Sequence, residues 1–477
     1  MKMFINGKAA DSSDGASIDV INPATGVVVD TVPAATAEDV ASAVKFARAA
    51  QPEWNAVPVW KRAEIMMAFL DLVERDKEKL ARTLSDETGK PITEARAEIG
   101  NIPIAFKAFS ERAKHLYDEV ITAGCEQGQD TTVLITRREP LGVVAAVIPF
   151  NFPCDLFDQK VAPALLAGNS VIVKPSTDNP LTLCMLTALL GEAGVTPGAA
   201  QIVTGRGSVV GHELCANPDV DLVTLTGSTE VGIETAEVCA KTLTHTALEL
   251  GGNDAFVVMP DADIELAASE VIWGRMYNTG QVCCASKRFL VHEDVAEEFA
   301  KKVVGKIGAL KQGMPSEEDT QIGCLISEKA ARTVEEQIQL TVQQGGKIVL
   351  GGGRDGAFIE PTVIVDVPKT ADVAIDMEIF GPVVPIITFK TAEEAIEIAN
   401  ASKFGLSSCI FSADQKTCAK FACELEAGGV VINGASFYRS FEQPFGGYKY
   451  SGIGTEGVMS TFDEMTHTKS IVLKNIL

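Results

Sequence analysis

The segment GVVAAVIPFNFPCDLFDQKVAPALLAGNSVIVKPS (residues 142–176) places a helix-like stretch between two short apolar strands. Both strands, GVVAAVIP and SVIVKPS, are almost continuously apolar, whereas a strand with one face in water alternates between apolar and polar residues. Strands of this kind joined by a helix are typical of a parallel sheet that helices cover on both faces. The segment therefore predicts an α/β fold built on a doubly wound parallel sheet.

The same alternation of strands and helices continues along the chain in two series. The first series goes on with AQIVTG, DLVTLTG and HTALELGG, and the second follows Gly251 with DAFVVM, KRFLVH, KIVLGG, VVPIITF, LSSCIF and GVVING. Because 477 residues are too many for one ordinary core, two or three domains are expected. We expect two α/β units with a boundary near residue 250.

Other elements are expected outside these series. Thr36 and Asp39 have the spacing of a capping box, and residues 58–116 favour two or three long amphipathic helices. The stretch TTVLITRREP is typical of a hairpin strand, and the terminal HTKSIVLKNIL predicts one more strand. A strand at the chain terminus needs a partner for its free edge.

Composition limits the possible functions. Apolar residues make up 46% and charged residues 22% of the chain, which is ordinary for a globular protein. The formal net charge of −23 disfavours a surface that gathers phosphate backbones. No apolar run approaches the roughly 20 residues that cross a bilayer, and the N-terminal stretch lacks the apolar region of a signal peptide. We expect a cytoplasmic protein without a nucleic-acid or membrane partner.

The cysteines and histidines do not have metal-site spacing. The eleven cysteines are scattered without a C-x-x-C pair, and the five histidines have no ligand-like spacing. This pattern favours reduced thiols over a disulfide framework, and it predicts no metal site.

Two glycine-containing turns follow neighbouring predicted strands. TGRGSVVGHEL (204–214) is one residue longer than the usual dinucleotide fingerprint, so by itself it also fits an ordinary strand–helix turn. LTGSTEVG (225–232) repeats the arrangement, with Ser228 and Thr229 able to cap the next helix and hold an anion. Two such turns at adjacent strand ends favour a nucleotide-binding crevice.

Three polar side chains stand at predicted strand ends. Lys174 in VIVKPS either marks where the chain reaches water or contacts a ligand. Asn151 in PFNFP either belongs to a rigid turn or points its amide at developing negative charge. Glu249 in LELGG is costly to bury unless it is paired or used, and burial would raise its pKa toward the range of a general base.

The stretch NTGQVCCASKR (278–288) places two thiols, Cys283 and Cys284, side by side. Either thiol, ahead of the helix-forming residues ASKR, could simply pack in the interior or act as a nucleophile. The residues themselves do not distinguish the two cysteines.

Taken in order, the motifs P-F-N-F-P, V-K-P-S, T-G-S-T-E-V-G, L-E-L-G-G, G-Q-V-C-C-A, E-I-F-G-P-V and P-F-G-G-Y-K-Y-S-G resemble the NAD(P)-dependent aldehyde dehydrogenase superfamily, from about residue 3 to the C-terminus. The resemblance implies that Cys283, two residues after Gln281, attacks the aldehyde carbon. It also implies that the Asn151 side chain and the Cys283 amide hold the oxyanion. Hydride would pass to NAD or NADP, and Glu249 would activate the water that hydrolyses the thioester to a carboxylic acid.

The resemblance assigns further positions one at a time. Lys160 is expected behind the catalytic pocket. Lys174 and Ser176 are expected at the adenosine ribose, and Glu378 and Phe380 at the nicotinamide ribose and ring. The complete cofactor-binding set that it implies is Lys174, Ser176, Thr177, Gly207, Gly227, Ser228, Leu250, Glu378 and Phe380.

The resemblance also implies a division of the chain. Residues 1–117 and 139–249 would form the NAD(P)-binding domain, and residues 250–446 a second α/β catalytic domain. Residues 118–138 and 447–477 would form a β-strand arm that pairs subunits into a homodimer or homotetramer.

Two positions depart from the common pattern. Thr177 stands where NAD-selective relatives carry an acidic side chain, so we expect NADP to be accepted beside NAD. The loop NGASFYRSFEQP (433–444) contains Arg439, where many broad-range members have no arginine. The loop most resembles the lactaldehyde and non-phosphorylating glyceraldehyde-3-phosphate dehydrogenases, with semialdehyde dehydrogenases nearby. A small polar or anionic aldehyde is the expected substrate, with Arg439 as its contact.

Two alternative functions stay open from the sequence. A relative that passes its thioester to coenzyme A would use the same fold, but such relatives typically lack the base that Glu249 supplies. A non-catalytic protein on this fold would have no reason to retain Cys283, Glu249 and Asn151 together.

Overall fold

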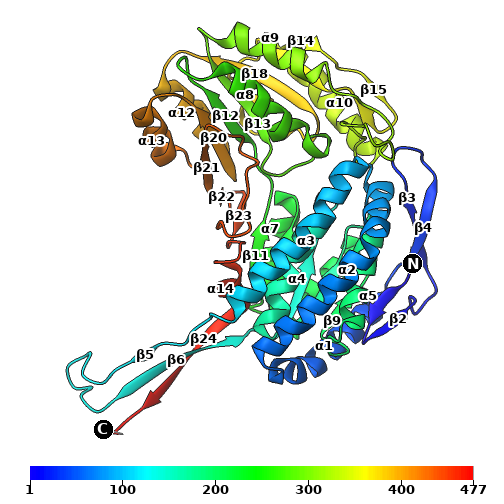
Figure 1. Ribbon diagram of the computed structural model, residues 1–477, viewed down its shortest axis with the longest axis vertical. Coiled ribbons are helices and arrows are strands. Elements are labelled where there is room, and N and C mark those ends of the chain that lie inside the picture. The colour runs from blue at the N-terminus through cyan, green and yellow to red at the C-terminus, as the bar shows by residue number, and fades with distance from the viewer. Residues whose placement is uncertain (476–477) are drawn as a thin grey trace.

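Two mainly parallel sheets lie in different parts of the molecule, and a strand arm projects from its body (Figure 1). The computed structural model describes residues 1–475. The first sheet has the strand order β2-β1-β9-β8-β7-β10-β11-β23. Its strands are β1 (Met3–Ile5), β2 (Lys8–Ala10), β7 (Val143–Val147), β8 (Ser170–Lys174), β9 (Ala200–Ile202), β10 (Leu222–Thr226), β11 (His245–Glu249) and β23 (Gly452–Ile453).

The strands β9-β8-β7-β10-β11, in this sheet order, run parallel to one another. At the two sides of this parallel set, β1 pairs with β9 and β23 pairs with β11, both antiparallel. The surrounding helices are α1 (Ala37–Ala56), α2 (Val59–Thr88), α3 (Ile92–Ala113), α4 (Pro153–Ala167), α5 (Leu181–Glu192), α6 (His212–Ala216) and α7 (Thr229–Cys239).

Successive residues of β7 face two different cores, which explains why this strand is apolar throughout. Val144 and Ala146 pack in the core that contains side chains of α2 to α5. Val143 and Ala145 pack in the core that contains side chains of α1 and α6. Helices therefore cover both faces of the sheet, and the predicted doubly wound α/β class is confirmed.

The second sheet has the order β14-β17-β18-β13-β12-β20-β21 and is parallel except for the edge pair β14–β17. Its strands are β12 (Asp254–Val258), β13 (Ser286–His292), β14 (Lys347–Leu350), β17 (Thr362–Val365), β18 (Val383–Phe389), β20 (Ser407–Phe411) and β21 (Gly429–Ile432). Its helices are α8 (Ile264–Val271), α9 (Ala296–Ile307), α10 (Glu328–Gln343), α11 (Asp372–Ile375), α12 (Ala392–Asn400) and α13 (Gln415–Glu424). The chain passes from the first sheet to the second between Glu249 and Asp254.

The arm consists of three antiparallel strands in the order β24-β6-β5 (Figure 1). They are β5 (Val120–Ile121), β6 (Val133–Pro140) and β24 (Thr466–Leu473), and α14 (Thr461–Met465) leads into β24. The terminal strand thus pairs with β6 of its own chain, from Thr466 opposite Pro140 to Leu473 opposite Val133. Its other edge has no partner within residues 1–475.

Three two-stranded sheets are also present: β3 (Ser17–Ile21) with β4 (Val28–Pro33), β15 (Arg354–Asp355) with β16 (Phe358–Ile359), and β19 (Phe404–Gly405) with β22 (Tyr448–Lys449). Gly452 and Ile453, which the sequence assigned to the arm, pair with β11 at the edge of the first sheet.

Most expected elements are present, and one local expectation is wrong. The capping box of Thr36 and Asp39 forms at the start of α1, and α2 and α3 are the long helices expected between residues 58 and 116. The residues of ASKR do not form a helix, because Ser286 begins the buried strand β13. Pairing with β12 and β18 on its two sides outweighs the helical preference of these residues.

No helix in the described part of the chain has both the length and the apolar character needed to cross a membrane.

Candidate active site

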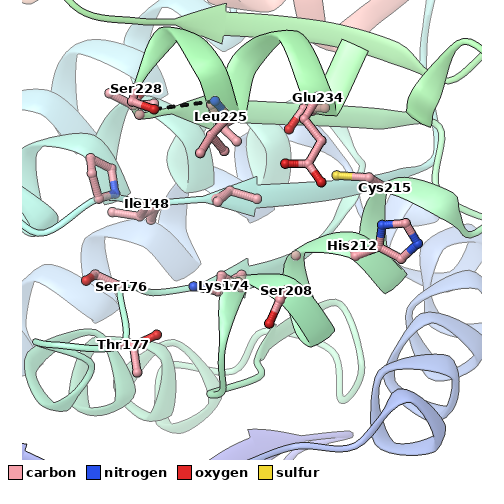
Figure 2. A pocket seen from close by; sticks show the side chains of 18 of the residues that line it. Ile148, Lys174, Ser176, Thr177, Ser208, His212, Cys215, Leu225, Ser228 and Glu234 are labelled. Atoms are coloured by element: carbon pink, nitrogen blue, oxygen red, sulfur yellow. Dashed lines mark hydrogen bonds between the residues drawn. The ribbon is translucent and has the colours of Figure 1, made fainter. Parts of the chain in front are cut away.

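A cavity of about 510 Å³ opens at the carboxyl ends of β7, β8 and β10 (Figure 2). This edge is where ligands bind in open parallel sheets. Residues from three segments predicted to contact the cofactor line it together, namely Lys174, Ser176, Thr177, Gly207, Gly227 and Ser228. Sequence positions far apart in the chain therefore meet in one crevice.

The first turn of α7 gives this crevice an anion-binding end. Ser228 is the N-cap of α7, and its hydroxyl accepts a hydrogen bond from the Val231 amide at 3.4 Å (Figure 2). The free amides and the positive end of a helix attract phosphate. Lys174 ends β8 beside this turn, and burial lowers the pKa of its ammonium to about 8.

The crevice also contains an unused hydrogen-bonding group. The hydroxyl of Thr226 is buried in the cavity wall and has no hydrogen-bond partner among the described residues. A buried hydroxyl without a partner is costly, so a bound polar ligand would satisfy it. The donor set, the helix terminus and this hydroxyl fit a dinucleotide. Thr177, by contrast, already donates its hydroxyl hydrogen to the Gly205 carbonyl at 3.3 Å.

The cysteine loop is held in an unusual backbone conformation. Asn278, Thr279 and Gly280 have φ angles of 50°, 53° and 77°, in the left-handed region. A Cβ on Gly280 would lie 2.3 Å from the Gly381 carbonyl oxygen, so only glycine fits beside this segment. The backbone amide of Asn278 donates a hydrogen bond to the Glu94 carboxylate at 2.9 Å, and this contact anchors the start of the loop.

The two adjacent thiols lie in different environments. Cys283 is partly exposed, whereas Cys284 is only 4% exposed. The neighbouring Cys284 thiol, with the positive charges of Lys287 and Arg439, outweighs burial and lowers the pKa of Cys283 to about 7. The neighbouring Cys283 thiol and burial raise the pKa of Cys284 well above the usual range. Of the two, Cys283 has the properties of a nucleophile.

Asn151 lies next to the cysteine loop. Its carbonyl accepts hydrogen bonds from the Lys90 ammonium at 3.0 Å and from the Asn278 side chain at 2.9 Å. These contacts fix the main chain that carries the Asn151 amide and connect it directly to the loop of Cys283.

Glu249 ends β11 as an almost fully buried carboxylate, 4% exposed. Neither of its side-chain oxygens has a hydrogen-bond partner among residues 1–475. Burial, together with the nearby charge of Glu456, raises the pKa of Glu249 well above its usual value against the opposing charges of Arg439 and Lys160. In its ionised form, a carboxylate with a raised pKa is a stronger base toward water than an ordinary one.

Glu456 joins the two cations beside Glu249 and was not foreseen from the sequence. It forms buried ion pairs with Lys160 and with Arg439, the latter at 3.1 Å. Burial raises the pKa of Glu456, but Lys160 and Arg439 outweigh it and hold the pKa below the usual value. The Arg439 guanidinium also lies 4.0 Å from the centre of the Phe445 ring. An acidic residue in the glycine-rich GIGTEGV was the available signal.

The remaining predicted cofactor residues lie outside the crevice. Glu378 lies 3.1 Å from the Lys287 ammonium, and Phe380 packs edge-to-face against Phe150 of the P-F-N-F-P motif. Both therefore lie near the cysteine loop rather than near Ser228. Leu250 packs against Gly232 and lines a separate, smaller hollow.

A nucleotide-type crevice, a thiol with a lowered pKa and a buried carboxylate are the features expected of a dehydrogenase that forms a thioester. The model of the aldehyde dehydrogenase family matches residues 10–471. The chain belongs to the aldehyde dehydrogenase family. The predicted family and oxidoreductase class are thereby confirmed.

Similar proteins cover the chain almost completely. Lactaldehyde dehydrogenase of Methanococcus maripaludis is 38% identical over 99% of this chain and 100% of its own length. Glutarate-semialdehyde dehydrogenase of Pseudomonas putida is 38% identical over 95% of this chain and 94% of its own.

Solved structures of family members have the same fold. An NAD-dependent aldehyde dehydrogenase from Sinorhizobium meliloti has a TM-score of 0.96 at 35% identity, covering 100% of this chain and 95% of that one. An NADP-dependent enzyme from E. coli also has a TM-score of 0.96, at 36% identity, covering 99% and 98%. Dependence on NAD or NADP, as predicted, is the rule among these structures.

Proposed function

We propose that this chain oxidises a small polar or anionic aldehyde to its carboxylic acid, with NAD or NADP as the oxidant, through a thioester on Cys283. One observation carries the proposal: the partly exposed Cys283 thiol lies among the same charged side chains as Glu249, a buried carboxylate without a hydrogen-bond partner among residues 1–475. Covalent catalysis of this kind replaces one difficult oxidation by two easier steps.

The Cys283 thiolate attacks the aldehyde carbon and forms a hemithioacetal whose oxygen carries negative charge. The Asn151 side-chain amide and the Cys283 backbone amide donate hydrogen bonds to that oxygen. Such bonds stabilise the transition state more than the bound aldehyde, because the negative charge develops during the reaction. Collapse of the adduct would re-form the carbonyl and expel hydride, for which a nicotinamide bound at this site would supply the acceptor.

Glu249 acts in the second step. Its carboxylate removes a proton from water, and the resulting hydroxide attacks the thioester carbon and releases the acid from Cys283. The ion pair Lys160–Glu456 lies beside Glu249. The charge of Glu456 raises the pKa of Glu249, and the charge of Lys160 lowers it. Transfer of the acyl group to coenzyme A is less well supported, because this buried base favours hydrolysis.

The adenosine and pyrophosphate part of the cofactor is assigned to the crevice, and its nicotinamide end to the residues near the cysteine loop. Ser228 and the α7 amides would hold the pyrophosphate, and Lys174 and Ser176 the adenosine ribose. Glu378 and Phe380 would hold the nicotinamide end. Thr177 carries no negative charge, so it would tolerate the 2′-phosphate of NADP.

The substrate class is inferred from Arg439 and the relatives. Arg439 is the one cation contributed by the loop 433–444, and it lies in the same charge cluster as Cys283. Lactaldehyde is a hydroxy-aldehyde, and glutarate semialdehyde is an aldehyde that bears a carboxylate. A guanidinium can donate hydrogen bonds to the hydroxyl oxygen of the first and to the carboxylate of the second.

We also propose a homodimer or homotetramer in the cytoplasm. The free edge of β24 and the exposed apolar side chains Val120 and Val472 support pairing through the arm. Division into a cofactor unit (1–117 and 139–249), a catalytic unit (250–446) and this arm is part of the proposal. All eleven cysteines are free, which suits a reducing compartment.

A panel of short aldehydes with each cofactor, followed at the absorbance of reduced nicotinamide, tests the function. We expect turnover with lactaldehyde and with ω-carboxylate semialdehydes, with the acid as product. Formation of NAD(P)H only when coenzyme A is added would instead favour the acylating alternative.

A further inference from the structure

Lys287 connects the cysteine loop to the segment that carries Glu378. It is the second residue of β13, and its side chain is 1% exposed. The ammonium donates a hydrogen bond to the Cys283 carbonyl and lies 3.1 Å from a carboxylate oxygen of Glu378. One buried cation thus contacts two residues that are far apart in the sequence.

An aromatic ring and two acidic side chains surround the Lys287 ammonium. The Phe380 ring centre lies 5.9 Å from the ammonium. Asp254 is buried with both oxygens unpartnered in the described chain, and burial raises its pKa to about 8 against the opposing charge of Lys287. Glu378 is therefore the acid that pairs directly with this lysine. A buried ammonium is costly unless it is paired and hydrogen-bonded, as it is here.

We propose that Lys287 is a positioning residue that fixes the Cys283 main chain against Glu378 and supplies positive charge that favours the Cys283 thiolate. This inference rests on the proposed function, in which Cys283 is the nucleophile and Glu378 contacts the nicotinamide ribose. It adds a residue that none of the sequence motifs had singled out for a role.

Several ionisable groups besides Lys287 act on the Cys283 sulfur, so the effect of Lys287 must be separated from theirs. They are Cys284, Arg439, Glu378, Glu249 and Asp254. Arg439 is paired with Glu456, and Lys287 with Glu378. Removing Lys287 and removing Glu378 should therefore shift the ionisation of Cys283 in opposite directions.

The test is the pH dependence of Cys283 alkylation by iodoacetamide in the full-length protein, followed by peptide mass spectrometry. In the wild type the rate should reach half its maximum near pH 7. In Lys287→Met we expect the midpoint to rise by about one pH unit, which lowers the rate at pH 6 about tenfold. Lys287→Arg, which keeps the charge, should restore most of the wild-type profile.

Glu378→Gln gives the second arm of the test. Because the negative charge of Glu378 raises the pKa of Cys283, its removal should move the alkylation midpoint downward. If Lys287→Met does not fold, Lys287→Gln, which also removes the charge, takes its place in the test. An unchanged midpoint in the folded uncharged variant would overturn the role of Lys287.

Alkylation needs neither aldehyde nor cofactor, so the two proposals can fail separately. A wild type without aldehyde oxidation that still shows both shifts would refute the proposed function and leave the Lys287 contact in place. A KM for NAD(P) that rises in Lys287→Met and returns in Lys287→Arg would support the link from Lys287 to Glu378, the carboxylate proposed to contact the cofactor.

Discussion

Arg439 forms an ion pair with Glu456, with 3.1 Å between the guanidinium nitrogen Nη2 and the carboxylate oxygen Oε2. The arginine therefore enters the site already oriented by a buried acid rather than as a free loop side chain. A guanidinium has five N–H donors, so this single contact leaves others available for a substrate carboxylate. Glu456 thereby positions the residue proposed to select the substrate.

Replacement of Arg439 by alanine should discriminate between charged and neutral aldehydes. A charge-assisted hydrogen bond contributes about 1.5–3 kcal/mol, so KM for a carboxylate-bearing semialdehyde should rise roughly 10- to 150-fold. Propanal should be affected much less. Arg332→Ala, at an exposed arginine on α10, is the matched control and should alter neither value. Equal losses for both aldehydes would remove Arg439 as the anion contact.

Glu249→Gln should separate the two chemical steps. The glutamine cannot deprotonate water, so a burst of NAD(P)H close to one equivalent per site should precede very slow turnover. Stopped-flow absorbance measures both phases. Loss of the burst in a folded variant would place Glu249 in the first step instead.

The pH dependence of deacylation should report Glu249. Burial and Glu456 raise the pKa of Glu249, so the ionised base is scarce at low pH and increases as the pH rises through that pKa. Thioester hydrolysis, measured after a single turnover, should accelerate over the same interval. This acceleration should be absent in Glu249→Gln, and a pH profile shared by both proteins would contradict the assignment.

Thr177→Glu should change cofactor choice. Two like charges about 4 Å apart cost roughly 4 kcal/mol at an effective dielectric of 20, which is enough to exclude the 2′-phosphate of NADP. We expect kcat/KM with NADP to fall at least tenfold while the value with NAD is retained. Thr177→Ser is the control that keeps the hydroxyl. A wild type without measurable turnover on NADP would contradict this interpretation of Thr177.

Much of the fold could be predicted because buried parallel strands leave a strong pattern. The alternation of Val143 with Val144 between two cores requires every residue of β7 to be apolar, and this is visible in the sequence. β17 was missed because it is short and lies among turn residues. The strand from Ser286 onward was partly mistaken for a helix, because its first residues are committed to β structure only by pairing with β12 and β18.

The candidate site was predictable only where a residue belongs to a motif. Glu249 and Lys174 are recognisable as polar residues at apolar strand ends. The roles of Glu456 and Lys287 depend on contacts with Arg439 and Glu378, which no local pattern specifies. The resemblance already selected Cys283 from its position two residues after Gln281, and the exposure and charge environment of the two cysteines give a physical reason for that choice.

In the proposed function Cys283, and not Cys284, carries the acyl group. The most direct test mixes Glu249→Gln with aldehyde and NAD(P), quenches in acid after the burst, and maps the modified peptide by tandem mass spectrometry. We expect one acyl group on the Cys283 sulfur, retained when Cys284 is replaced by alanine and lost when Cys283 is replaced. An acyl group on Cys284, or a full NAD(P)H burst in Cys283→Ala, would contradict it.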